Sequence, residues 1–210
     1  MIDGASNPLV VIVSGPSGSG KSTLVNKILD LPDTMLSVSC TTRPPRRTES
    51  EGKWYNFIGE EEFQRMADAG EFLEHAQVFG RSWYGTPRRW LDEARSQRKD
   101  LILEIDVQGA AQVRQELSRA LAIFILPPSV KELEQRIRER GQDSAEEIER
   151  RLQRARQEVK CFVEYDYAVV NDNLEAAGRK IQSIVLAARC EIKRDVEHFH
   201  EILRGMGFLW

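Results

Sequence analysis

Near its N-terminus the chain reads Gly15-Pro16-Ser17-Gly18-Ser19-Gly20-Lys21-Ser22, which matches the pattern G-x-x-x-x-G-K-[ST] of a phosphate-binding loop. An apolar run, residues 9–13, precedes this P-loop, and a helical pattern, residues 23–29, follows it. Strand, glycine-rich turn and helix form the context in which such a loop holds phosphate, because backbone N–H groups and the helix dipole converge on the anion. The stretch therefore predicts a nucleoside-triphosphate site, and its position disfavours the alternative of an ordinary strand-to-helix turn.

Two P-loop side chains have distinct expected roles. Lys21 can reach the β- and γ-phosphates, and the Ser22 hydroxyl is a hard oxygen ligand for Mg²⁺. The expected contacts with the nucleotide phosphates are Gly15, Pro16, Ser17, Gly18, Ser19, Gly20, Lys21, Ser22 and Thr23.

Composition restricts the class of protein. The chain has 210 residues, of which 41% are hydrophobic and 30% charged, with a formal net charge of −3, so it predicts one compact domain or a core with insertions. The small net charge gives no argument for nucleic acid or a membrane as partner, and no run approaches the roughly 18 apolar residues of a membrane span. Three cysteines without C-x-x-C spacing and no basic leader favour free thiols in the cytoplasm. The composition does not decide between a monomer and a homo-oligomer.

Apolar runs alternate with helical patterns along most of the chain. Such alternation predicts an α/β fold, a P-loop parallel sheet covered by helices on both faces. We expect this core to comprise residues 1–38, 89–129 and 161–210. The expected strands are residues 9–14, 35–39, 101–106, 121–126 and 167–170, and the expected core helices are 20–31, 87–97, 109–118 and 174–195.

Two segments depart from the core pattern. Residues 39–88 contain short alternating runs and one helical stretch, which predict an inserted small α+β subdomain of antiparallel strands plus a helix. Residues 130–160 form a charged helical hairpin, with nine Lys/Arg and eight Asp/Glu between residues 131 and 160. The hairpin is either a solvated surface pair of helices or a mobile lid, and its charge predicts poor anchoring to the core. We expect the apolar residues of the C-terminal tail to be buried, either against the rest of the chain or at a subunit contact.

Acidic and basic side chains suggest two phosphate sites. Asp106 ends a buried strand, so it can help to hold Mg²⁺ directly or through a water, and Glu104 lies on the same face unless both simply face solvent. Arg43, Arg46 and Arg47 lie on a proline-stiffened loop with no acid until Glu49, which suits bidentate phosphate binding better than a solvated basic loop. Since the P-loop has its own cradle, these arginines suggest a kinase whose acceptor is a phosphate ester.

The P-loop together with five further segments closely resembles the guanylate kinases, which phosphorylate GMP from ATP. The resemblance covers nearly the whole chain and implies that 39–88 is a GMP-binding subdomain and 130–160 a lid. It further implies Mg²⁺ with ATP as cofactor and GMP or dGMP as acceptor. The five segments are Ser37–Arg46, Tyr55–Phe57, Phe72–Ala76, Tyr84–Thr86 and Ile105–Gly109.

The resemblance also implies roles for individual residues. Ser39, Glu74 and Thr86 read guanine, Asp106 lies near both nucleotides with Glu104 beside the GMP site, and Asn171 lies near the adenosine. The GMP phosphate is held by Arg43, Arg46, Tyr55 and Tyr84, and the ATP phosphates are approached by the lid arginines Arg136, Arg140 and Arg151. The catalytic set is Lys21, Arg43, Arg140, Arg151 and Asp106, and the Mg²⁺ set is Ser22 and Asp106.

These residue types suit the chemistry. One carboxylate, Glu74, can accept both N1–H and N2–H₂ of guanine, whereas adenine would oppose it with a lone pair. A phosphate with a second pKa near 6 is largely ionised at neutral pH, so no general base is required, and we interpret His75 as structural. The work of the protein is in-line alignment and charge neutralisation.

Three other classes fit the sequence less well. A related ribose-bisphosphate-type kinase is disfavoured by Ser39 and Glu74, and a binding-only scaffold domain by the intact P-loop. A GTPase switch is disfavoured because the chain has no N-K-x-D motif for the base.

Overall fold

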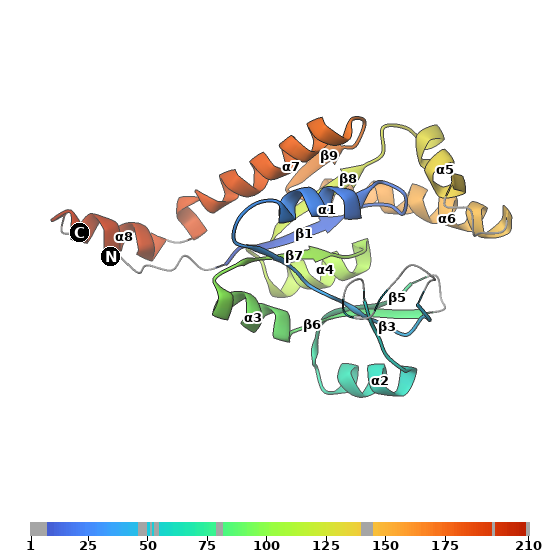
Figure 1. The fold of residues 1–210 in the computed structure, drawn as a ribbon, viewed down its shortest axis with the longest axis horizontal. Coiled ribbons are helices and arrows are strands. Elements are labelled where there is room, and N and C mark those ends of the chain that lie inside the picture. The colour runs from blue at the N-terminus through green and yellow to red at the C-terminus, as the bar shows by residue number, and fades with distance from the viewer. Residues whose placement is uncertain are drawn as a thin grey trace.

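The computed structural model describes residues 8–45, 50, 52, 55–78, 82–139, 145–194 and 196–208. Its centre is a five-stranded sheet in which every neighbouring pair of strands is parallel (Figure 1). This confirms the predicted α/β fold. The strand order is β2 (Thr34–Leu36), β7 (Asp100–Glu104), β1 (Val10–Ser14), β8 (Leu121–Leu126) and β9 (Tyr167–Val170).

Helices cover both faces of this sheet, which is why its middle strands read as nearly continuous apolar runs. On one face, α1 (Lys21–Leu29) and α7 (Leu174–Arg189) pack against side chains such as Val11 and Ile123. On the other, α3 (Arg89–Gln97) and α4 (Val107–Glu116) pack against Ile12 and Leu103. Figure 1 shows these two helix layers above and below the sheet.

The inserted segment forms a separate four-stranded sheet with one helix, α2 (Glu60–Asp68). β6 (Ser82–Pro87) pairs antiparallel with both β3 (Cys40–Thr41) and β5 (Phe72–Val78), but β3 and β4 (Asn56–Phe57) pair parallel, so the expectation of antiparallel strands was wrong for this pair. Phe63 of α2 packs on Phe72 and Cys40, which gives the insert its own small core. The strand order in this sheet is β4, β3, β6 and β5.

The charged hairpin consists of α5 (Val130–Glu139) and α6 (Ala145–Glu158), and α6 continues as a 3₁₀ helix, η1 (Val159–Glu164). It has a buried cluster that includes Leu133, Ile137, Leu152 and Ala155. A Cβ atom on Gly18 would lie 3.1 Å from both Leu133 and Ile137, so this cluster rests on the P-loop. The hairpin thus has a small core of its own beside the P-loop, separate from the clusters of the central sheet, and this core was not predicted.

Several element boundaries differ from the expected ones, among them the end of β2, which stops at Leu36 and not at residue 39. β7 ends at Glu104 and α4 begins at Val107, because the Asp106 carboxylate caps α4 by accepting bonds from the Gln108 and Gly109 amides. α7 ends at Arg189, and after a short 3₁₀ helix, η2 (Ile192–Arg194), the chain forms α8 (Val196–Gly205).

The C-terminal region does not pack as expected over its whole length. Val196, Met206 and Phe208 are exposed, and Figure 1 shows α8 extending away from the central sheet. All three cysteines are free thiols, and no helix in the described ranges is both long and apolar enough to cross a membrane.

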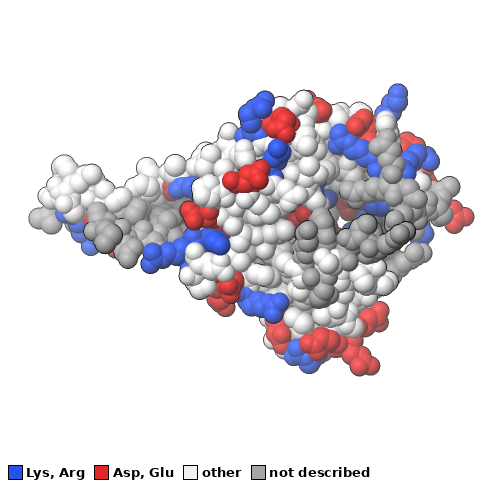
Figure 2. Space-filling view, in the orientation of Figure 1, with Lys and Arg blue, Asp and Glu red and all other residues white. Residues whose placement is uncertain are grey.

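The surface in view mixes charges of both signs. Figure 2 shows Lys and Arg interspersed with Asp and Glu on this face, with acidic side chains gathered over α2. This agrees with the nearly balanced composition.

One buried ion pair joins three elements at the end of the sheet where β1 and β7 begin. Asp100 is 9% exposed. Its Oδ1 accepts a hydrogen bond from the Leu9 amide at 2.8 Å, and its Oδ2 accepts one from Arg189 Nε at the end of α7 at 2.7 Å. Arg189 also donates to the Pro32 carbonyl at 2.8 Å.

Replacing Asp100 should therefore destabilise the fold. We expect Asp100→Ala to lower the free energy of unfolding by about 2–4 kcal/mol, because it leaves the Leu9 amide and the Arg189 guanidinium without their acceptor. Urea denaturation followed by circular dichroism measures this. The matched control is Asp92→Ala, which removes an exposed carboxylate 3.5 Å from Arg95 and should change stability by less than about 0.5 kcal/mol. Equal losses in the two variants would contradict the assignment.

Candidate active site

Most of the predicted functional residues line one cleft where β1 and β7 end. A cavity of about 470 Å³ lies between the P-loop, the inserted sheet and the α5–α6 hairpin. Ligand sites in parallel sheets form at this edge, beyond the carboxyl ends of the strands. Its lining includes Lys21, Ser22, Ser39, Arg43, Tyr55, Glu74, Tyr84, Glu104, Asp106 and Arg151, together with Arg154 and Glu158.

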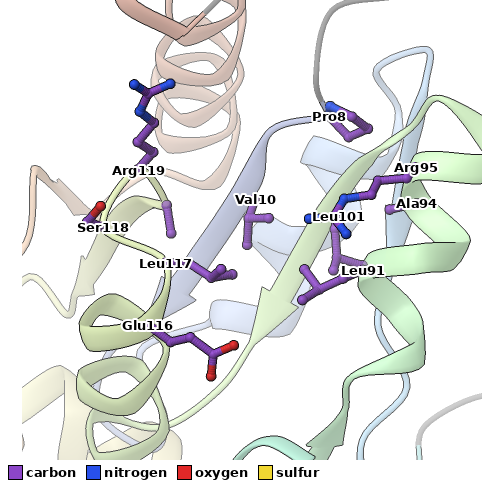
Figure 3. Close-up of a pocket in the computed structure, with 11 residues that line it drawn as sticks. Pro8, Val10, Leu91, Ala94, Arg95, Leu101, Glu116, Leu117, Ser118 and Arg119 are labelled. Atoms are coloured by element: carbon purple, nitrogen blue, oxygen red, sulfur yellow. The ribbon is translucent and has the colours of Figure 1, made fainter.

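A different hollow, of about 330 Å³, lies by the opposite ends of these strands, between α3 and α4. Figure 3 shows apolar side chains such as Val10, Leu91 and Leu117 around it, with Glu116 and Arg95 nearby. Glu116 is already paired with Arg88. None of the predicted site residues lines this hollow, so the cleft at the P-loop is the candidate active site.

The P-loop backbone has the conformation that an anion cradle requires. Gly20, which precedes α1, has φ 88°, and α1 has no acidic residue in its first turn. A Cβ atom on Gly20 would lie 2.2 Å from Nδ2 of Asn171, which donates a hydrogen bond to the Ser19 carbonyl at 2.9 Å. Only glycine therefore fits at this position, and the N-terminal amides of α1 are open to a negatively charged ligand.

Lys21 lies back across the P-loop. Its Nζ donates hydrogen bonds to the carbonyl oxygens of Gly15 at 2.7 Å and Pro16 at 3.1 Å. The ammonium group is thus held beside the cradle, where phosphate oxygens can replace these carbonyl acceptors.

The two acids at the carboxyl end of β7, Glu104 and Asp106, have different partners. Ser22 Oγ donates to Glu104 Oε1 at 2.6 Å, so the predicted Mg²⁺ ligand lies against Glu104. Asp106 instead accepts bonds from the Gln108 and Gly109 amides, both at 3.0 Å, and from Arg154 Nη2 at 2.9 Å. The hydroxyl of Ser22 and the carboxylate of Glu104 are hard oxygens, the ligand type that Mg²⁺ prefers.

The three residues expected to read guanine form one chain of hydrogen bonds. Glu74 of β5 and Thr86 of β6 are direct cross-strand partners, and Thr86 Oγ1 donates to Glu74 Oε1 at 2.6 Å. Ser39 Oγ lies 3.0 Å from Thr86 Oγ1. Because the Thr86 hydroxyl has a single proton, Ser39 must be the donor in that second bond. Ser39 and Glu74 thus line the cleft as hydrogen-bond acceptors.

The Glu74 carboxylate is buried, with only 5% of the residue exposed. Burial raises the pKa of Glu74 to about 7, and the negative charge of Asp106 adds to this, while the hydrogen bond from Thr86 opposes it. In this pocket a charged carboxylate is therefore costly until a ligand supplies hydrogen-bond donors.

Gly109 supports this carboxylate from α4, a role that the sequence pattern did not predict. A Cβ atom on Gly109 would lie 2.3 Å from Glu74 Oε2, so any side chain there would displace the carboxylate. The available signal was an isolated glycine within a helical pattern, which often marks a close approach.

The expected acceptor-phosphate residues also lie together. Arg43 Nε donates to Tyr84 Oη at 3.0 Å, and the Arg43 guanidinium lies 5.1 Å from the Tyr55 ring centre. The two tyrosine rings meet edge to face, 5.5 Å apart. Arg46 lies outside the described residues.

On the lid side, Arg151 Nη2 donates to Ser17 Oγ of the P-loop at 2.8 Å. Arg136 Nη2 donates to the Asn171 carbonyl at 3.3 Å, and both residues line an open hollow of about 410 Å³ beside Thr23. Arg140 lies outside the described residues. The sequence analysis missed Arg154 and Glu158, although Arg154 is three residues after Arg151 and so shares its helix face.

His75 contributes nothing to the cleft. Its ring packs among the rings of Phe63, Phe72 and Trp83 in the core of the insert. This agrees with its structural interpretation.

Comparisons with known proteins point to one family. A sequence profile described as "Guanylate kinase" matches residues 7–188. This chain is 46% identical to the guanylate kinase of Desulfitobacterium hafniense (strain Y51) over 187 residues, which cover 89% of this chain and 93% of that protein. It is 47% identical to that of Hahella chejuensis (strain KCTC 2396) over 196 residues, covering 93% and 94%. A crystal structure of guanylate kinase from Anaplasma phagocytophilum superposes with a TM-score of 0.79 at 35% identity, covering 95% of each chain.

Because the Glu74 carboxylate is buried, replacing it with a neutral group should stabilise the protein, and the gain should depend on pH. The pKa of Glu74 in the folded protein, about 7, exceeds the ordinary value of 4.5, so wild-type stability falls as pH rises between these values. We expect Glu74→Gln to raise the free energy of unfolding by up to about 3 kcal/mol at about pH 8 and by little at about pH 5.

Denaturant unfolding of the nucleotide-free protein at the two pH values measures this difference. Glu93→Gln, an exposed substitution on α3, is the control and should show no pH-dependent gain. A gain of the same size at both pH values would argue against a desolvated carboxylate at Glu74.

Proposed function

This chain belongs to the guanylate kinase family, and from that premise we propose that it transfers the γ-phosphoryl group of ATP to GMP, and also to dGMP. The observation that carries the proposal is the acceptor chain Ser39–Thr86–Glu74 facing the P-loop across a single cleft. In this reading residues 39–88 are the acceptor-binding unit and residues 130–160 are the lid.

The donor half is the P-loop with its neighbours. Backbone amides of the loop and the Lys21 ammonium hold the ATP phosphates, and Arg136 and Asn171 flank the hollow suited to the adenosine. Ser22 with Glu104, and Asp106 through a water, would hold Mg²⁺, which neutralises charge on the phosphate oxygens when it is bound.

The half of the cleft that binds GMP selects the base with hydrogen-bond acceptors only. The carboxylate of Glu74 takes the N1–H and N2–H₂ donors of guanine, and the Ser39 oxygen offers a further acceptor nearby. Adenine lacks N2–H₂ and places a lone pair at N1, so the buried carboxylate would be left unsatisfied. Arg43, Arg46, Tyr55 and Tyr84 hold the GMP phosphate.

The transfer step requires alignment rather than a base. The GMP phosphate is already largely ionised at neutral pH, and no histidine of the described cleft is placed to take a proton. Lys21 and the lid arginines Arg136, Arg140 and Arg151 stabilise charge on the transferring group, a contribution that is about 10³–10⁵-fold for a catalytic arginine in other phosphotransferases.

The substrate panel tests the proposal directly. We expect ADP release from ATP and Mg²⁺ with GMP and dGMP, and about 10³-fold less with AMP, CMP or UMP. Lys21→Ala should abolish turnover while GMP binding, measured by calorimetry, stays within about threefold, because Lys21 belongs to the donor half. Turnover with none of the five nucleotides would refute kinase activity and favour a binding-only domain.

Gly109 provides a second test of base recognition. Gly109→Ala should raise the KM for GMP about tenfold or more and leave the KM for ATP unchanged, because the new Cβ atom displaces Glu74. Loss of folding is not the expected cause, since alanine is better than glycine within a helix by about 1 kcal/mol.

The control for this variant is Gly178→Ala in α7. There the new Cβ atom would meet only the flexible Lys27 side chain, at 3.2 Å, so steady-state constants should be unchanged. Unaltered GMP kinetics in Gly109→Ala would show that Glu74 does not depend on this contact.

A further inference from the structure

Arg154 of α6 is a charged residue of the cleft to which the proposed reaction assigns no role. Its Nη2 donates to Asp106 Oδ2 at 2.9 Å, and both side chains are about a quarter exposed, at 23% and 24%. A charge-assisted bond in such a sheltered position is stronger than an exposed surface pair. Arg154 therefore joins the lid hairpin to the loop that follows β7.

A second acid fixes the orientation of the guanidinium. Arg154 Nε donates to Glu158 Oε1 at 2.7 Å, four residues along the same helix, and the Glu158 side chain is only 10% exposed. With Glu158 on one edge and Asp106 on another, the planar group is held in a defined position.

Asp106 passes this constraint to the guanine site. Its Oδ1 accepts hydrogen bonds from the Gln108 and Gly109 amides, both at 3.0 Å, and so anchors the first turn of α4. Gly109 is also the residue against which the Glu74 carboxylate rests. The contacts run without interruption from Arg154 through Asp106 and Gly109 to Glu74.

One face of α6 thus serves both halves of the cleft. Arg151 donates to Ser17 of the P-loop, and Arg154, one helical turn later, donates to Asp106 beside the acceptor site. We propose that Arg154 is a positioning residue for the acceptor: it holds Asp106, and through Asp106 and Gly109 it fixes the guanine-reading carboxylate relative to the P-loop.

The proposal also has an electrostatic side. Without Arg154, the Asp106 carboxylate would face the incoming GMP phosphate without this partner, and like charges repel in a partly desolvated cleft. Loss of Arg154 should therefore weaken the acceptor half specifically. This inference rests on the proposed function, since GMP is the ligand through which it is measured.

The experiment compares steady-state constants for the two substrates. We expect Arg154→Ala to lower kcat/KM for GMP about tenfold or more while the KM for ATP stays within about twofold. Arg154→Lys should recover part of the loss, because an ammonium group can bind Asp106 but cannot also reproduce the fork to Glu158. The matched control is Arg156→Ala, an exposed arginine on the same helix, which should behave as wild type.

A double-mutant cycle with Gly109→Ala tests the contact chain itself. Once the Cβ atom introduced by Gly109→Ala has displaced Glu74, removing Arg154 has less left to disturb, so the combined loss in kcat/KM for GMP should be clearly smaller than the product of the single losses. Thermal unfolding of each variant, with Arg154→Gln as a milder replacement, identifies any loss caused by global instability.

Three outcomes would overturn the inference: GMP kinetics unchanged in Arg154→Ala, equal losses for ATP and GMP, or fully multiplicative losses in the cycle. The failure of the proposed function is distinct, because it would appear as the absence of GMP turnover in the wild-type protein.

Discussion

The Asp106 carboxylate is the point at which the three parts of the molecule meet. It follows β7 of the core, caps α4 through two backbone amides, and accepts a hydrogen bond from Arg154 of the α5–α6 hairpin. Through Gly109 it also supports the side chain of Glu74 from the insert. A single residue can organise these parts because a carboxylate has two oxygens, and here each oxygen has its own partners. Asp106 thereby fixes the proposed donor and acceptor sites relative to each other.

Stability and specificity oppose each other in this cleft. Burial raises the pKa of Glu74 to about 7, so the empty pocket disfavours the ionised carboxylate, which is the form that the proposed contact with guanine uses. Guanine supplies two donors that restore the balance, whereas adenine supplies none at the same positions. In the proposed function, the ionised Glu74 carboxylate lowers the stability of the empty protein, and its need for two hydrogen-bond donors discriminates guanine from adenine. Ser39 and Thr86 extend the same logic, since their protons are committed to the chain that ends on Glu74.

Local patterns predicted the core well, because a P-loop between strand and helix and apolar runs between helices leave few alternatives. Contacts between residues far apart in the sequence were harder to predict. The Ser22–Glu104 bond joins residues 82 positions apart, and nothing in either segment indicates which of the two acids Ser22 would meet. The pairing of β3 and β4 was wrongly expected to be antiparallel, and the small core of the hairpin was not predicted, because short strands and widely spaced apolar positions carry little periodicity. The start of α4 was misplaced because Asp106, expected to end a strand, caps a helix instead.

The two halves of the cleft share one structural device. In the donor half Asn171 lies against Gly20, and in the acceptor half Glu74 lies against Gly109; a Cβ atom on either glycine would come within 2.2 or 2.3 Å of the polar group. In both cases a glycine at the start of a helix beside the cleft leaves room for a polar side chain from a distant segment. Because the contact is with the backbone, its geometry depends on where the helix starts rather than on a flexible neighbour. In the acceptor half the Asp106 cap of α4 and the position of Glu74 are therefore coupled through Gly109, and the proposed role of Arg154 reaches the base through this coupling without a direct contact.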